Sequence, residues 1–247
     1  MLTLSTAALA LLLAAASAAA PLSASIVPPI GGVVRFHIVR TTQDAAGAQT
    51  ASSDVTLRRK AATTATLEGT IAGHAADLTV LNVGRDGSLY IPKSDKVASQ
   101  DAATVDVVSG LNRLTELFAG QTGAPNPDGW AATLAFPETH GATASIEVPI
   151  AVEHVAGTDF DLRGDGQYAP PQPVAQPGSH RGGGRRAEMP EPVFGAPAKL
   201  PYGVTVGIQG QVRRGMASKV TINEVRTVTV DGLQFTNVSG WTIEALR

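Results

Sequence analysis

The chain of 247 residues is long enough for one or two domains, and we expect one, because single β-rich domains of this size are common. Its formal net charge of −2 and isoelectric point near 6.2 argue against nucleic acid as a partner, since nucleic-acid-binding domains are usually basic. The absence of cysteine excludes disulfides, thiol nucleophiles and cysteine-based metal sites, so the fold depends on its apolar core.

Residues 1–20 carry no charge and pass from a leucine-rich run into an alanine tract. This pattern predicts a secretory signal peptide, with the exported chain beginning near Ala19 or Ala20. A membrane anchor is the competing interpretation, but the apolar run is short and half alanine. We therefore expect a secreted or periplasmic protein with no integral membrane segment after cleavage.

Alternation of apolar and polar residues predicts several strands before residue 100, the first from Val33 to Arg40. Farther on, Gly73 and His74 separate two alternating runs and suit a two-residue hairpin loop, because a type II′ turn has glycine at its first loop position. This register places four apolar residues on one inward face. They are Leu67, Ile71, Leu78 and Val80.

One short helix is predicted in the middle of the chain. Leu111, Leu114 and Phe118 recur at helical spacing, with Ser109 available as an N-terminal cap and Gly120 just after the last apolar residue. Strands are again predicted from Trp130 onward.

The strand pattern is interrupted between residues 164 and 201, where proline, glycine and arginine predominate. Such a composition favours a disordered arm, because it buries too little apolar surface to offset the entropy of ordering. The sequence thus predicts a signal peptide at 1–20, a single β-rich domain formed by 21–163 and 202–247, and a flexible Pro/Gly/Arg-rich insert at 164–201.

After the insert, Asp231-Gly232 between Val230 and Leu233 is a strong signal for a two-residue hairpin loop. A type I′ turn requires positive φ at both loop positions, and Asp and Gly tolerate it. Pairing outward from this loop sets the register of the last two strands. The predicted pairs are Val228 with Phe235, Ile222 with Trp241, and Val220 with Ile243. Threonines collect on the opposite face, which we expect to be solvated.

Eleven strand candidates and one helix predict a mainly β fold, an antiparallel meander. A sandwich, a half-barrel wrapped on the helix and a closed barrel remain alternatives at this point. The order of elements resembles that of secreted bacterial lipid and lipoprotein carriers, in which a curved antiparallel sheet closes over a helix. The resemblance covers layout and no motif, and it implies an apolar ligand.

No cofactor and no metal site is expected. The five histidines are scattered, with no pair at zinc-ligand spacing. Three carboxylates at Asp159, Asp161 and Asp165 suggest a calcium loop, but Arg163 occupies a ligand position and no glutamate closes the loop, so we interpret them as solvated hairpin charges.

The predicted register places four polar residues, Glu224, Arg226, Asn237 and Ser239, in the middle of an otherwise apolar face. Either a β-bulge near Asn223 turns Val225 inward instead, or the sheet lines a cavity with a polar floor. We favour the bulge, because bulges are common and buried ion pairs are unfavourable.

The sequence favours a non-enzymatic exported protein that binds an apolar ligand or a partner protein at the cell envelope. The predicted ligand-binding residues are Glu224, Arg226, Asn237, Ser239, Leu114 and Phe118. The alternative is a secreted hydrolase with an unrecognised carboxylate site, because glycosidase carboxylates leave no local signature. Two carboxylates facing each other across a cleft would favour the hydrolase. The sequence specifies no oligomeric state.

Overall fold

The computed structural model describes residues 26–92, 101–119, 121, 126, 128–137, 143–169, 202–230 and 233–246. These residues form eleven strands and one helix. The elements are β1 (Val33–Asp44), β2 (Gly47–Ala61), β3 (Thr64–Ile71), β4 (His74–Val83), β5 (Leu89–Tyr90), α1 (Ala102–Phe118), β6 (Trp130–Pro137), β7 (Thr143–Ala156), β8 (Asp159–Tyr168), β9 (Gly203–Arg213), β10 (Met216–Val230) and β11 (Leu233–Leu246).

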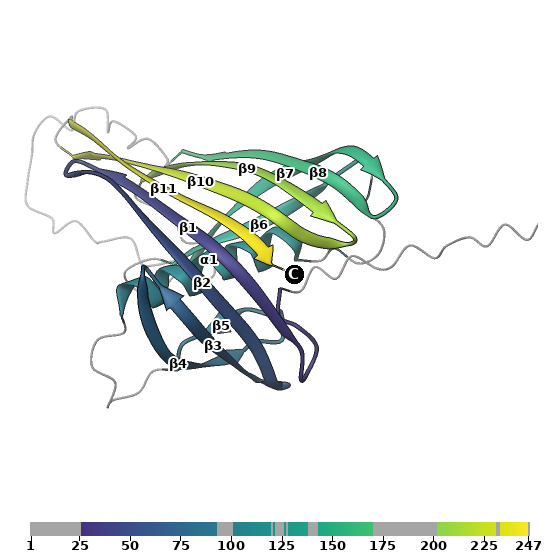
Figure 1. The fold of residues 1–247 in the computed structure, drawn as a ribbon. Coiled ribbons are helices and arrows are strands. Elements are labelled where there is room, and N and C mark those ends of the chain that lie inside the picture. The colour runs from purple at the N-terminus through teal and green to yellow at the C-terminus, as the bar shows by residue number, and fades with distance from the viewer. Residues whose placement is uncertain are drawn as a thin grey trace, which may run out of the picture.

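All eleven strands belong to one open antiparallel sheet, in the order β5-β4-β3-β2-β1-β11-β10-β9-β8-β7-β6. Two meanders, β1 to β5 and β6 to β11, join through the pairing of β1 with β11 at the centre. The sheet curls around α1, so its concave face holds the core (Figure 1). The prediction of a mainly β antiparallel meander with one helix is confirmed, and of the three predicted architectures the half-barrel is the one observed.

The helix occupies the chain between β5 and β6, which are the two edge strands of the sheet. It therefore crosses the concave face and contacts both edges through side chains. Asn112 donates to the carbonyl of Leu89 in β5 at 2.9 Å and accepts from the Leu89 amide at 2.8 Å. On the other edge, Arg113 donates to the carbonyl of Ala135 in β6, and Glu116 accepts from the Ala135 amide at 3.3 Å. The helix thus satisfies backbone groups that an open sheet leaves unpaired.

The predicted helix is confirmed, but its predicted start at Ser109 is wrong. The helix begins at Ala102, and Asp101 caps it by accepting from the amide of Ala103 at 3.3 Å. The additional turns bury Val107 and Val108 against the sheet. Packing of an amphipathic face stabilises this first half of the helix, whose local pattern is weak.

The predicted loop between β3 and β4 is wrong by one residue. Ile71 pairs with His74, so the loop is Ala72-Gly73, with φ of 49° and 81°. With a further irregularity between Leu67 and Gly69, Leu67 pairs with Thr79. Moving the loop by one residue shifts the pairing by two and keeps the faces, whereas the irregularity shifts the pairing by one and exchanges the faces of β4 beyond it. Leu78 and Val80, predicted inward, are therefore exposed, while Leu81 and Val83 are buried.

The register predicted for the last hairpin is confirmed. Val230 pairs with Leu233, Ile222 with Trp241, and Val220 with Ile243. The expected bulge near Asn223 is wrong, because pairing with β11 is continuous from Lys219 to Val230. The four polar residues therefore do lie on the concave face.

Strand β8 continues to Tyr168, so the first residues of the interval predicted as an insert belong to the sheet. The expectations for residues 1–20 and 170–201 lie outside the described residues. Among the residues that the structure describes, no helix combines the length and apolarity needed to cross a bilayer.

Candidate ligand-binding groove

A groove of about 690 Å³ lies at the end of the sheet where two hairpins separate. The described pairing of β1 with β11 ends at Gln43 and Val238, while β11 stays paired with β10 as far as Leu233 and Val230. Val228 and Phe235 supply apolar surface to this groove, and Arg226 and Asn237 supply polar groups. The other lining residues are Gln43, Asp44, Ala45, Tyr202, Gln234, Thr236 and Val238.

Arg226 is half-buried at the inner end of the groove. Its guanidinium lies 5.6 Å from the ring centre of Phe136 and 5.8 Å from that of Tyr202. One terminal nitrogen donates to Glu224 Oε2 at 3.1 Å. Arg226 therefore connects the groove with a charged cluster beneath it.

Glu224 lies at the centre of that cluster, with no exposed side-chain surface. Its second oxygen accepts from Arg113 Nε on the helix at 2.7 Å. Arg113 also donates to Glu116 at 2.7 Å and stacks over Phe136 at 4.3 Å. The buried carboxylate is stable here because two arginines bond to its two oxygens, which offsets the loss of hydration.

Glu116 and Arg40 show the electrostatic effect of burial on this cluster. Burial raises the pKa of the Glu116 carboxyl, and the neighbouring Arg113 opposes this shift. Burial also lowers the pKa of the Arg40 guanidinium, with Asp106 and Glu224 opposing the shift. Arg40 lies 3.9 Å from the ring centre of Trp241 and donates to Ser239 Oγ at 3.2 Å.

Two arginine nitrogens in this region have no acceptor. Among the described residues, the buried side-chain nitrogen and oxygen atoms without a hydrogen-bond partner are Arg40 Nε and Arg226 Nε. Arg40 Nε lies 3.8 Å from Asp106 Oδ1, which is too long for a hydrogen bond. Both atoms therefore belong to groups next to the Glu224–Ser239 pair.

The six residues predicted as ligand-binding occupy three environments. Arg226 and Asn237 line the groove. Glu224 and Ser239 are buried beside it, and Leu114 and Phe118 lie in the packed core beneath the helix. The prediction missed Val228, Phe235 and Tyr202, as well as the arginines at 40 and 113. Arg40 follows the inward alternation of Val34, Phe36 and Ile38, which is the signal that could have identified it.

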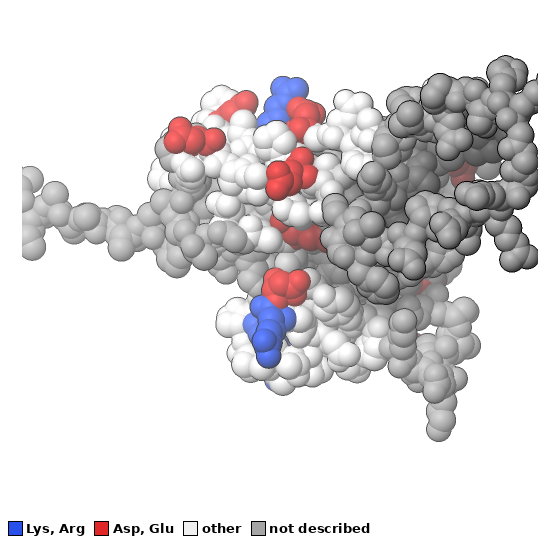
Figure 2. Space-filling view, turned by 180° about the vertical axis from the view of Figure 1, so that it is seen from behind, with Lys and Arg blue, Asp and Glu red and all other residues white. Residues whose placement is uncertain are grey.

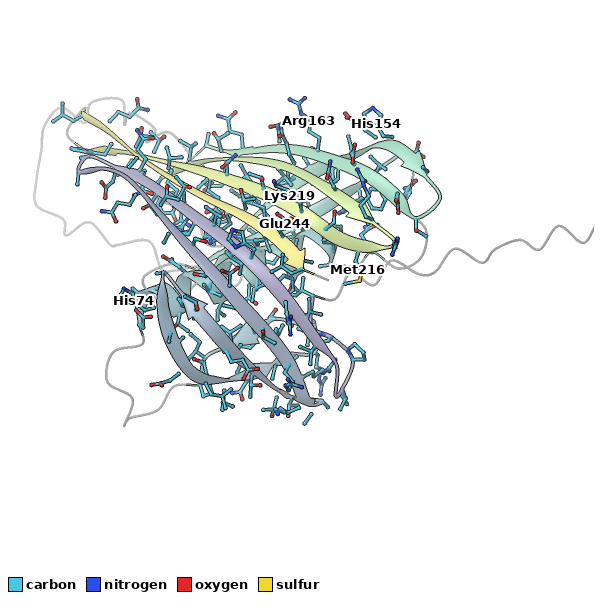
Figure 3. All side chains as sticks on the ribbon, viewed as in Figure 1. His74, His154, Arg163, Met216, Lys219 and Glu244 are labelled. Atoms are coloured by element: carbon cyan, nitrogen blue, oxygen red, sulfur yellow. The ribbon has the colours of Figure 1, made fainter. Side chains whose placement is uncertain are left out.

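The convex face has a second depression of about 510 Å³, lined mostly by polar residues of β7 to β10. Asp161 lines it and binds Arg213 at 2.7 Å, a hydrogen bond that lowers the pKa of the carboxyl. Lys219 and Glu244 are paired neighbours on this solvated side (Figure 3). From the opposite side of the molecule, acidic side chains are scattered over the described surface and basic ones lie near its upper and lower margins (Figure 2).

Among the described residues, no group of three His, Asp or Glu side chains is placed to hold a metal ion. His74 and His154 lie at opposite ends of the sheet (Figure 3). Asp159 accepts from the amide of Arg214 at 2.6 Å, and Asp165 lies 3.7 Å from Arg163. These carboxylates therefore have partners on their own or the neighbouring hairpin.

No protein-family model matches the chain, and no curated protein sequence matches it. One solved structure, described as lipid-protein interactions in lipovitellin, aligns with 89% of this chain at 8% identity and a TM-score of 0.44. The chain spans 25% of the length of that structure's chain.

Proposed function

We propose that this protein is a non-enzymatic binding protein that holds an amphipathic ligand in the groove at the end of β10 and β11. The observation that carries the proposal is the exposure of Phe235 inside the groove, at 54%. An aromatic side chain in a concave site, next to a few polar groups, is the usual chemistry of a small-ligand site. The groove volume of about 690 Å³ also falls within the range of such sites.

The apolar part of the ligand would contact Val228 and Phe235, and its polar end would lie toward Arg226 and Asn237. This arrangement differs from the predicted one, in which Leu114 and Phe118 lined an interior space. Those two side chains are 1% and 3% exposed, so a ligand would have to displace the core to reach them.

The hydrolase alternative requires two carboxylates facing each other across a cleft. The carboxylates of the charged cluster are the buried Glu224 and the partly exposed Glu116, and Arg113 lies between them with a 2.7 Å bond to each. In a hydrolase of this kind the scissile bond of the substrate lies between the two carboxylates, and here the Arg113 guanidinium fills that space. The geometry of this pair favours the binding protein.

Export to the periplasm or the cell exterior is part of the proposal and is supported by the composition of residues 1–20. Mass spectrometry of protein from the producing cells is expected to show a chain that begins near Ala19 or Ala20. An intact Met1 on the exported protein would contradict this part of the proposal.

Ligand binding can be tested with the neutral fluorescent probe Nile red. The folded protein should bind the probe, and Phe235→Ser should weaken binding about fivefold or more, because the substitution removes aromatic contact area. Leu78→Ser is the matched control, because Leu78 is similarly exposed, at 58%, but lies on β4, which three strands separate from β11. Equal binding by both variants and the unmodified protein would contradict the proposal.

A further inference from the structure

We infer that the groove selects amphiphiles with an anionic head group, a carboxylate or a phosphate, which Arg226 and Asn237 bind. This inference rests on the proposed function and adds the chemistry of the ligand's polar end. It depends on the donors, the charges and the geometry at the inner end of the groove.

The first step concerns unpaired donors. Buried polar atoms in proteins almost always have hydrogen-bond partners, so an exception requires an explanation. Both exceptions among the described residues, Arg40 Nε and Arg226 Nε, are arginine donors in one small region. Ser239 links them, because it accepts from Arg40 and pairs across the strands with Glu224, which binds Arg226. An acceptor is therefore lacking at this position.

The second step concerns the acceptors already present. Glu224 uses one oxygen for Arg113 and the other for Arg226. Asn237 Oδ1 accepts from Ser239 Oγ at 3.4 Å, which leaves the Asn237 amide group as a further donor in the groove. A ligand that supplies acceptor oxygens fits this set of donors better than one that supplies hydroxyl donors.

The third step concerns charge. Glu116, Arg113, Glu224 and Arg226 form a chain of alternating charges that ends on a cation at the groove. Glu224 shares its single negative charge between two arginines, so Arg226 is only partly neutralised. Asp44 is the carboxylate that lines the groove, and it accepts from the amide of Ala46 at 2.8 Å within the β1–β2 turn. An anion on Arg226 would continue the alternation.

The fourth step concerns geometry. A guanidinium presents donors in a planar fork that matches carboxylate and phosphate oxygens. Arg226 has apolar side chains on the groove side, since Val228 follows it on the same face of β10 and Phe235 pairs with Val228. A single ligand can therefore place an acyl chain on these two residues while its head group reaches Arg226.

The test compares decanoate with decanol as competitors of bound Nile red on the full-length protein. The two ligands have the same chain length and differ in head group. Decanoate should displace the probe at a concentration about tenfold lower than decanol, because charge-assisted hydrogen bonds are stronger than neutral ones. Decyl phosphate should behave like decanoate. Equal potency of decanoate and decanol would overturn the inference and leave the proposed function intact.

Two variants locate the selectivity. Arg226→Gln should reduce the preference for decanoate to about twofold or less, because glutamine keeps a neutral donor but carries no charge. Asn237→Asp places a negative charge at the exposed Asn237 without affecting the core, and it should reduce decanoate potency about tenfold. Asn82→Asp, the same charge change on β4, should leave both potencies unchanged. Retention of the preference in both groove variants would overturn the inference.

Sodium phosphate and sodium acetate distinguish a head group from a free anion. Neither salt should displace Nile red at the concentrations at which decanoate does, because neither has an acyl chain. Displacement by the salts alone would assign the site to free anions and overturn the inference. Absence of Nile red binding by the unmodified protein would instead refute the proposed function itself.

Discussion

The concave face of β10 and β11 has a covered half and an open half. In the covered half, Ile222 and Trp241 pair across the strands and lie beneath the helix, 0% and 4% exposed. In the open half, Val228 pairs with Phe235 on the same face, yet Phe235 is 54% exposed. Both pairs follow the same alternation. The pattern of a strand therefore determines which face a side chain occupies, and a separate element determines whether that face is covered.

The boundary between the two halves is the charged cluster. Trp241 packs on the helix at Gly110 and donates to the carbonyl of Asp106 at 3.2 Å. One step along the strands, Arg113 contacts Glu224, and one step farther Arg226 faces the groove. The charges thus separate a packed interior from a solvated one on a single sheet surface.

Breaking the ion pairs of the charged cluster should have the largest effect on stability. Arg113→Met leaves Glu224 buried with one cationic partner and removes the main partner of Glu116. We expect a loss of about 3–5 kcal/mol in the free energy of unfolding, measured by urea denaturation. A loss below about 1 kcal/mol would mean that water reaches Glu224 and that the boundary does not exist in solution.

Two controls separate charge pairing from the loss of side-chain volume. Arg58→Met breaks an exposed pair with Glu68, 4.0 Å apart, and should change stability by less than about 1 kcal/mol. Adding Glu224→Gln to Arg113→Met should recover part of the loss, because the uncompensated carboxylate is gone. If the double variant is less stable than the single one by the full effect of Glu224→Gln, the two residues are not coupled.

The sequence predicted the registers of two hairpins unequally. The register of β10 and β11 was predictable because Asp231-Gly232 is a strong local turn signal between two long alternating runs. The register of β3 and β4 was not, because the loop places Ala72 at positive φ, which alanine rarely adopts, and because an irregularity between Leu67 and Gly69 exchanges the faces of β4. The turn preference of a short stretch of sequence predicted the register only where the whole fold uses that turn.

The charged cluster shows a second limit. The alternation placed Glu224 on the inward face, but a lone buried carboxylate is unfavourable, so a bulge was the better expectation from the strand alone. The compensating group, Arg113, is 111 residues away in the sequence and comes from the helix. A single sequence contains no local signal for such a pair. The groove was not predictable either, because it depends on where β1 and β11 separate.

In the covered half, the helix lies so close to the sheet that adding one methyl group at Gly110 tests the contact. Gly110→Ala would place a Cβ atom 2.6 Å from Trp241 Cδ1. Alanine ordinarily stabilises a helix interior by about 1 kcal/mol relative to glycine. Here we expect a net loss of about 1–3 kcal/mol, because the ring must move within a packed core. Thermal unfolding and a change in Trp241 fluorescence would report the effect.

Ser109→Ala is the control for that substitution, because Ser109 lies on the same turn and is not one of the buried residues of the helix. It should be neutral or slightly stabilising, in accord with helix propensity. Stabilisation by Gly110→Ala of the same size would show that the helix stands away from the sheet and that the covered half is not packed.

In the open half, the smallest effect on stability is expected, and it is the most informative for function. Phe235→Ser removes an aromatic side chain, which in a packed core would lower the free energy of unfolding by about 3–5 kcal/mol. Because Phe235 is 54% exposed, we expect less than about 0.5 kcal/mol by urea denaturation at low protein concentration. A loss above about 1.5 kcal/mol would mean that Phe235 is covered in solution, and the groove would then not be free for a ligand.

Repeating the measurement at tenfold higher protein concentration distinguishes two causes of such covering. Covering by a second copy makes stability concentration-dependent, whereas covering within one chain does not. A small effect at both concentrations, together with weakened Nile red binding, is the combination that an open binding surface requires.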